Sequence, residues 1–148
     1  MGTQDQVIYD VQLYLEKAEN MLVLSPPDVV LFSELIWGAA AMCIRKFCLS
    51  NFKINIKSHG ATLRLMNIVE ENLHRKPSDI RILSKAFNHA KQCHKNFYDL
   101  GFLADKFRQS ILASMQNMEK IMDAPIAKKL KQDVIDLLKK DLSLDKTG

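Results

Sequence analysis

The residues best suited to chemistry lie between positions 87 and 99, which hold two of the four histidines and one of the three cysteines. His89 and Cys93 are four residues apart, so on a helix they share a face and could supply two ligands to a zinc ion. His94 lies about 140° further round such a helix than His89, on another face. Because the remaining zinc ligands would have to come from distant parts of the chain, we predict no metal site.

Recognised catalytic motifs are missing from the sequence. It contains no Gly-rich phosphate loop, no G-x-S-x-G elbow and no H-E-x-x-H pair, and we expect no cofactor. One reaction that needs few residues is metal-independent RNA cleavage, in which histidine takes the ribose 2′-hydroxyl proton and cations stabilise the charge on phosphate. The simpler interpretation of His94 is a hydrogen-bonded core or interface residue, because it falls on an apolar stripe.

The formal net charge of +4 is unevenly distributed. Residues 1–44 hold six acids and one base, residues 45–95 hold eleven bases and three acids, and residues 96–148 hold nine bases and eight acids. The basic excess predicts an anionic partner such as RNA, held mainly by its phosphates because no series of aromatic residues offers a stacking platform. The alternative is a solvated face matched by the acidic segment, within the chain or across a dimer. The expected anion contacts are Arg81, Lys85, Lys91 and Lys95.

Length and composition predict a single helical domain. A chain of 148 residues can bury a core, and 47% hydrophobic with 26% charged residues is typical of a globular protein. We expect one domain over residues 1–148, with its core at about 5–141 and a frayed tail at 142–148. The low glycine and proline content, together with the scarcity of strand-like alternation, favours an all-α fold.

The cysteines and the hydrophobic runs indicate where in the cell the protein is expected to lie. The three cysteines show no C-x-x-C spacing, which argues against a disulfide scaffold and for an intracellular protein, cytoplasmic or nuclear. The first residues show no signal-peptide pattern. The most hydrophobic run, residues 29–49, is interrupted by charged and polar residues, so we interpret it as a core helix and expect no membrane association.

Apolar spacing predicts five or six helices in an up-and-down bundle. Ile8 is expected on the buried face of the first helix and Leu137 on that of the last. Residues 50–60 alternate in a strand-like way, but without a partner strand we predict an extended loop. Asp28 or Ser25 is suited to cap the second helix. The expected helices cover about residues 4–24, 27–49, 61–75, 78–96 and 102–122, with a last one from Pro125.

The second helix is apolar nearly all round, as is typical of a central helix. Small residues at 38–41 form a thin waist, where another helix can approach closely. Trp37 stands beside this waist, and we interpret it as a core residue in preference to a ligand platform.

Three stretches together resemble the HEPN superfamily (higher eukaryotes and prokaryotes nucleotide-binding), and more narrowly the small PaREP-type helical proteins of archaea. They are residues 33–40 (S-E-L-I-W-G-A-A), 58–60 (S-H-G) and 93–99 (C-H-K-N-F-Y-D), and the resemblance covers about residues 5–125. It implies a bundle of four or five helices that pairs with a second copy around a shared cleft. Together with the small residues of the second helix, it gives an expected dimer interface of Trp37, Gly38, Ala41, Met42, His94 and Tyr98.

Many HEPN domains are metal-independent ribonucleases with an R-x(4–6)-H motif, in which histidine is the acid/base and arginine stabilises the phosphorane-like state. By resemblance His94 matches the motif histidine, but the arginine position falls on His89 or on Asn88, according to the spacing. A neutral imidazole lacks the fixed charge and forked donors of arginine. The motif is therefore degenerate, and the nearby cations that can substitute in part are Arg81, Lys91 and Lys95.

The leading hypothesis is a non-catalytic HEPN-like helical module that forms a dimer and serves as an RNA-associated or protein-interaction component. A first alternative is a metal-independent endoribonuclease that uses His94 with His89. A second is a scaffold that binds another helical protein and never touches nucleic acid. Salt dependence of binding separates these hypotheses, because phosphate contacts weaken steeply as salt rises.

Overall fold

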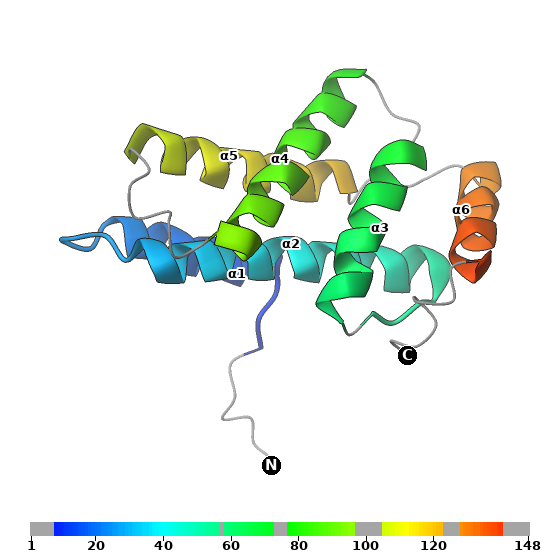
Figure 1. The fold of residues 1–148 in the computed structure, drawn as a ribbon, viewed down its shortest axis with the longest axis horizontal. Coiled ribbons are helices and arrows are strands. Elements are labelled where there is room, and N and C mark those ends of the chain that lie inside the picture. The colour runs from blue at the N-terminus through cyan, green and yellow to red at the C-terminus, as the bar shows by residue number, and fades with distance from the viewer. Residues whose placement is uncertain (1–7, 57, 73–76, 97–104, 123–127, 141–148) are drawn as a thin grey trace, which may run out of the picture.

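The computed structural model describes residues 8–56, 58–72, 77–96, 105–122 and 128–140 (Figure 1). Within these ranges it contains helices and no strand, which confirms the predicted all-α class. The elements are α1 (Val11–Leu22), α2 (Val29–Phe52), α3 (His59–Asn72), α4 (Pro77–Asn96), α5 (Asp105–Met122) and α6 (Lys128–Lys140).

Side-chain caps explain where α1, α2 and α3 begin. Asp10 accepts a hydrogen bond from the backbone N–H of Leu13 at 2.8 Å, so α1 begins later than the sequence pattern predicts. The predicted cap Asp28 accepts from the N–H of Leu31 at 3.0 Å. In α3 the hydroxyl of Ser58 accepts from the N–H of Ala61, also at 3.0 Å. Each cap satisfies a backbone donor that has no partner within the helix.

α2 extends to Phe52, beyond the predicted end at about residue 49. Lys53 then takes a left-handed conformation with φ of 59°, and its N–H bonds to the carbonyl of Leu49 at 3.2 Å. A left-handed residue just past the last turn is a common way to end a helix. The described residues between Lys53 and Ser58 are not helical, in agreement with the predicted loop.

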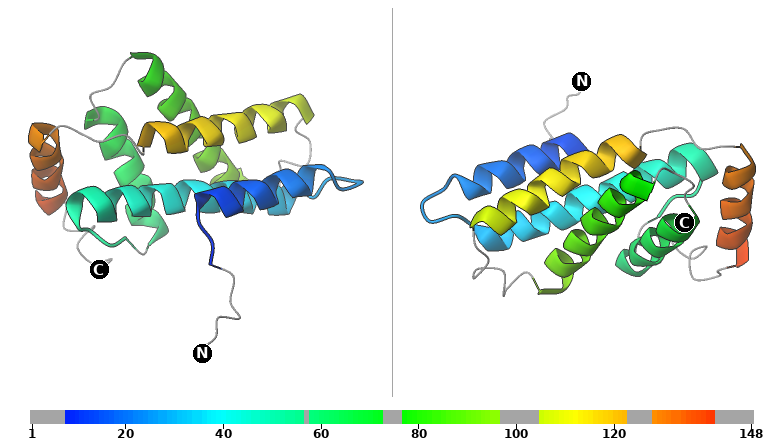
Figure 2. Two further views of the ribbon diagram at one scale, coloured as in Figure 1. Left: turned by 180° about the vertical axis from the view of Figure 1, so that it is seen from behind. Right: turned by 90° about the horizontal axis from the view of Figure 1, so that it is seen from above.

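α2 is the central helix, as predicted, and it contacts each of the other five. α1 runs antiparallel beside it, and α5 lies on top of both and roughly in line with them (Figures 1 and 2). α4 and α3 are steeply inclined to α2 and cover successive parts of it, while α6 stands at the far end near α3. In Figure 1 the pair α1–α2 lies below α5, and the start of α3 extends below the level of α2.

The core is one cluster centred on α2. Phe32 and Ile44 of α2 are fully buried, as are Leu83 and Phe87 of α4 and Met115 of α5. Aromatic and aliphatic side chains of this size contribute most of the hydrophobic stabilisation of a domain. None of the described helices is long and apolar enough to cross a membrane.

Two predictions of buried residues are wrong. Ile8 is 78% exposed, because Asp10 caps the helix and Ile8 lies two residues before this cap, outside the helix. Leu137 is 38% exposed, although Val134 of the same helix is buried. α6 turns the side of Val134 and Ile135 toward the core, and Leu137 lies about 160° round the helix from Ile135.

Candidate functional site

His89 points from α4 toward α5. Its Nδ1 lies 2.9 Å from the hydroxyl oxygen of Ser114, and that hydroxyl donates to the carbonyl of Ile111 at 2.8 Å. Because the Ser114 proton is engaged, Nδ1 of His89 carries the hydrogen and donates to the Ser114 oxygen. The side chain is only 6% exposed, so His89 acts as a link inside the α4–α5 contact.

The environment of His89 favours its neutral form. Burial lowers the pKa of its imidazole below 6.5, and the nearby positive charge of Lys85 lowers it further. A general acid must carry a proton that it can give to the leaving group, and this site disfavours that form. The environment therefore suits a structural histidine.

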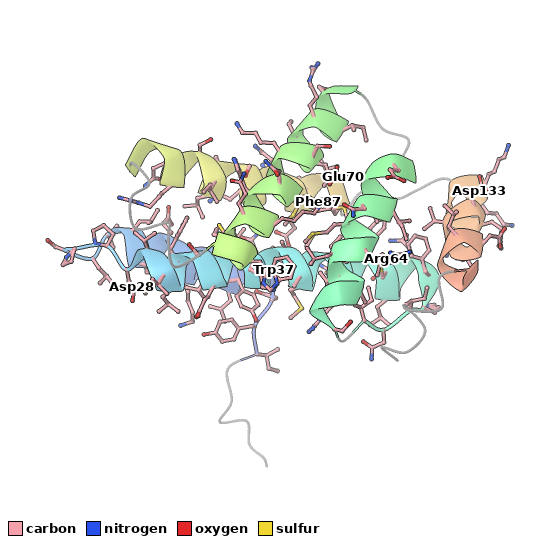
Figure 3. The ribbon with its side chains drawn as sticks, in the orientation of Figure 1. Asp28, Trp37, Arg64, Glu70, Phe87 and Asp133 are labelled. Atoms are coloured by element: carbon pink, nitrogen blue, oxygen red, sulfur yellow. The ribbon has the colours of Figure 1, made fainter. Side chains whose placement is uncertain are left out.

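His94 points to the opposite neighbour, α2. Its ring stacks on Trp37, with ring centroids 4.2 Å apart and planes inclined by 23°. Trp37 is buried, as expected for a core residue, and Figure 3 labels it on α2 beside the C-terminal end of α4. The structure therefore does not bring His89 and His94 together, in agreement with their predicted placement on different faces.

Cys93 is buried on α4 near Ser33 of α2, and burial raises the pKa of its thiol to about 12. The pKa of Cys48 is also raised to about 12, by burial and then by Cys43. All three cysteines are free. Among the described residues no three His, Cys, Asp or Glu side chains come together as a metal site.

Of the three expected anion contacts whose side chains the structure describes, two are open on α4. Arg81 and Lys85 are exposed. Lys91 is instead tied to α3, with its Nζ 2.6 Å from Oδ1 of Asn67 and 3.7 Å from Oε1 of Glu70. Glu70, labelled in Figure 3, also accepts a hydrogen bond from Ser84 at 3.2 Å. The fourth contact, the side chain of Lys95, lies outside the described residues.

The expected dimer residues have contacts within the chain. Trp37 and Ala41 are buried, while Gly38 and Met42 are half-buried. Gly38 lies against Tyr14 of α1, so close that a Cβ at position 38 would be 2.4 Å from a ring carbon. The predicted waist therefore receives a helix of the same chain. Tyr98 lies outside the described residues.

The same waist borders a hollow of about 250 Å³, a feature that is not among the predictions from the sequence. A second hollow, of about 430 Å³, adjoins it and shares Met42 and Arg45. The first is lined by Tyr14, Glu34, Trp37, Gly38, Ala41, Met42 and Arg45. The second is lined by Asp10, Val11, Met42, Arg45, Lys46, Leu49, Asn55 and Glu119. Glu34, Gly38, Ala41 and Arg45 follow one another at spacings of four, three and four residues, and this pattern indicates from the sequence that they lie on one side of α2.

Comparisons of the chain with protein-family models, with curated proteins and with solved structures find no match. The resemblance to HEPN proteins stays a prediction.

Proposed function

We propose that the protein is a non-catalytic helical module that binds RNA through its phosphates, on the outer face of α4 and α5. The observation that carries this proposal is the character of the side chains exposed there. Three are cationic, several are amides and, among the described residues, none is acidic. The exposed set is Ser78, Arg81, Lys85, Asn88, Gln92, Gln109, Ala113, Gln116, Asn117 and Lys120.

The exposed acids among the described residues lie on or beside α1, α2, α3 and α6, and none lies on α4 or α5. Glu16 and Glu19 are exposed on α1, and Asp28 and Glu34 are exposed at the start of α2. In Figure 1, α5 and the start of α4 lie above α1 and α2, and α4 then descends in front of them to the level of α2. Among the described residues, α1 and α2 expose acids together with bases such as Lys46, whereas the exposed charges of α4 and α5 are bases alone, so an anion is attracted to the α4–α5 face.

Cations and amides suit contacts with a nucleic-acid backbone. Arginine and lysine neutralise phosphates, and side-chain amides donate hydrogen bonds to phosphate or ribose oxygens. No series of exposed aromatic side chains is present among the described residues of α4 and α5, so base stacking is not expected. Binding should therefore depend strongly on salt and weakly on RNA sequence.

We propose a non-catalytic module because His89 and His94 each make a packing contact inside the protein. His89 is buried against Ser114, and His94 is stacked on Trp37. The R-x(4–6)-H motif needs an arginine before His94, and the positions five and six residues before it hold His89 and Asn88. A pair that cleaves RNA has to reach one phosphodiester together, and these two side chains face different helices.

The test is a salt titration of binding to single-stranded and hairpin RNA. We expect the R81E/K85E variant to bind at least tenfold more weakly and to lower the slope of log Kd against log salt by roughly 1.5. The control K128E/K129E changes the net charge equally at exposed residues of α6 and should bind nearly as well as the wild type.

Each alternative hypothesis predicts a distinct result in the same RNA-binding reactions. RNA cleavage that is lost in H94A with the fold intact would support the ribonuclease. No binding by the wild type at low salt would contradict the proposal and favour the protein scaffold. An equal loss in both charge-reversal variants would mean that net charge, not the α4–α5 face, determines binding.

A further inference from the structure

The exposed side chains of α4 lie in a single row. Within the described part of this helix the exposed residues are Ser78, Arg81, Lys85, Asn88 and Gln92, which we call the α4 row. Their spacings of three, four, three and four residues keep them in line on one side of the helix. At 1.5 Å per residue the α4 row is about 21 Å long. It therefore holds its polar groups at regular separations along a straight element.

The chemistry of the α4 row changes along its length. Arg81 and Lys85 are one helical turn apart, and both are cations that suit phosphates. Asn88 and Gln92 follow on the same side, and a side-chain amide can both donate to a hydroxyl group and accept from it. The row thus places positive charge for phosphates next to neutral hydrogen-bonding groups that suit ribose hydroxyls.

The neighbouring helices fix the orientation of the α4 row. Leu83 and Phe87, on the opposite side of α4, are fully buried in the core. Lys91 is tied to α3 and His89 is linked to α5 by the hydrogen bonds described above. A surface that is already ordered in this way binds a regular, stiff ligand with a smaller loss of conformational freedom than a flexible one.

Two features of this face favour double-stranded over single-stranded RNA. Proteins hold single strands by stacking bases on aromatic rings and by a basic groove that follows the backbone. The described residues of α4 and α5 expose no aromatic side chain, and neither of the two hollows described above is lined by a residue of α4. The minor groove of an RNA duplex is wide and shallow, and it displays 2′-hydroxyls beside the phosphates. A straight helix face with cations followed by amides matches that surface.

We infer that the α4 row binds the minor groove of double-stranded RNA, with Arg81 and Lys85 on phosphates and with Asn88 and Gln92 on ribose 2′-hydroxyls. This inference rests on the proposed function and names its substrate class. The 2′-hydroxyl is the group by which a protein distinguishes RNA from DNA. The cations therefore supply most of the affinity, and the two amides supply the preference for RNA.

Binding of three nucleic acids at one salt concentration tests the inference: an RNA duplex, the DNA duplex of the same sequence, and one strand of the RNA. We expect the wild type to bind the RNA duplex about fivefold more tightly than either of the others. N88A/Q92A removes both amides without a change of charge, so it should lose this preference and bind the DNA duplex as well as the wild type does. The control N20A/Q132A removes exposed amides of α1 and α6 and should behave like the wild type.

An RNA duplex that is methylated at its 2′-oxygens separates the hydroxyl contacts from the shape of the groove. It keeps the A-form geometry, but its 2′-oxygens cannot donate hydrogen bonds. The wild type should bind it about fivefold more weakly than the unmodified RNA duplex, whereas N88A/Q92A should bind the two nearly equally.

Equal binding of the RNA and DNA duplexes by the wild type would overturn the inference. So would tighter binding of the single strand, or a preference for RNA that persists in N88A/Q92A. In each of these cases a loss of binding in R81E/K85E would still support phosphate binding by the α4–α5 face, so the proposed function can stand when this inference fails. No binding of any of the three nucleic acids would contradict both. Circular dichroism melts confirm that the variants are folded.

Discussion

His94 of α4 stacks on Trp37 of α2, with ring centroids 4.2 Å apart. This contact joins the end of α4 to the middle of the central helix, next to the hollow that Trp37 also lines. The histidine that the resemblance assigns to catalysis thus contributes to packing between α4 and α2.

Truncation of His94 should expose Trp37. In H94A the stacked ring is removed, so we expect the emission of the one tryptophan to shift to longer wavelength, with a loss of about 1–2 kcal/mol in stability. Fluorescence spectra and urea unfolding measure the two effects. H94F is the matched control: an aromatic ring can stack on Trp37 without a titratable group, so its emission should resemble that of the wild type. Equal emission from H94A and the wild type would contradict the stacking.

Stability should fall at acidic pH because of His89. Its pKa is below 6.5 in the folded state, so the unfolded chain binds a proton more readily. The contribution is fully present above pH 6.5 and decreases as the pH falls below that value. Urea midpoints at pH 7.5 and 5.5 measure the change. H89Q, which can still donate to Ser114, should show a smaller pH dependence; an identical dependence would mean that other groups are responsible.

Addition of a methyl group at Gly38 should separate α1 from α2. A Cβ there would meet the Tyr14 ring at 2.4 Å, so we expect G38A to lower the unfolding free energy by about 1–3 kcal/mol. Y14A removes the obstructing ring. In the double variant the cost of G38A should be largely lost, because the two substitutions act on one contact. Additive losses in this cycle would place the strain elsewhere.

The thiols should be unreactive in the folded protein. At pH 8, pKa values of about 12 for Cys48 and Cys93 leave a thiolate fraction on the order of 10⁻⁴, and burial also blocks access. Ellman's reagent should therefore react slowly without denaturant and with all three cysteines in urea. Rapid reaction of one native thiol would contradict its buried placement.

The periodic and capping signals of the sequence determined the helical fold. Apolar residues three and four positions apart indicate the helices, and Asp28 is one of the two residues, with Ser25, whose side-chain oxygen is suited to accept from the first turn of α2. The central position of α2 also followed from its apolar surface. These properties depend on near neighbours in the chain, which is why the sequence alone predicts them.

Only the tertiary structure decided which surfaces meet. Gly38 was predicted to receive another helix, but the sequence does not say that Tyr14 of the same chain occupies one flank. Lys91 was predicted as an anion contact, yet the approach of α3 ties it to Asn67 and Glu70. Such contacts depend on how helices pack, and side-chain periodicity specifies a buried face without specifying its partner.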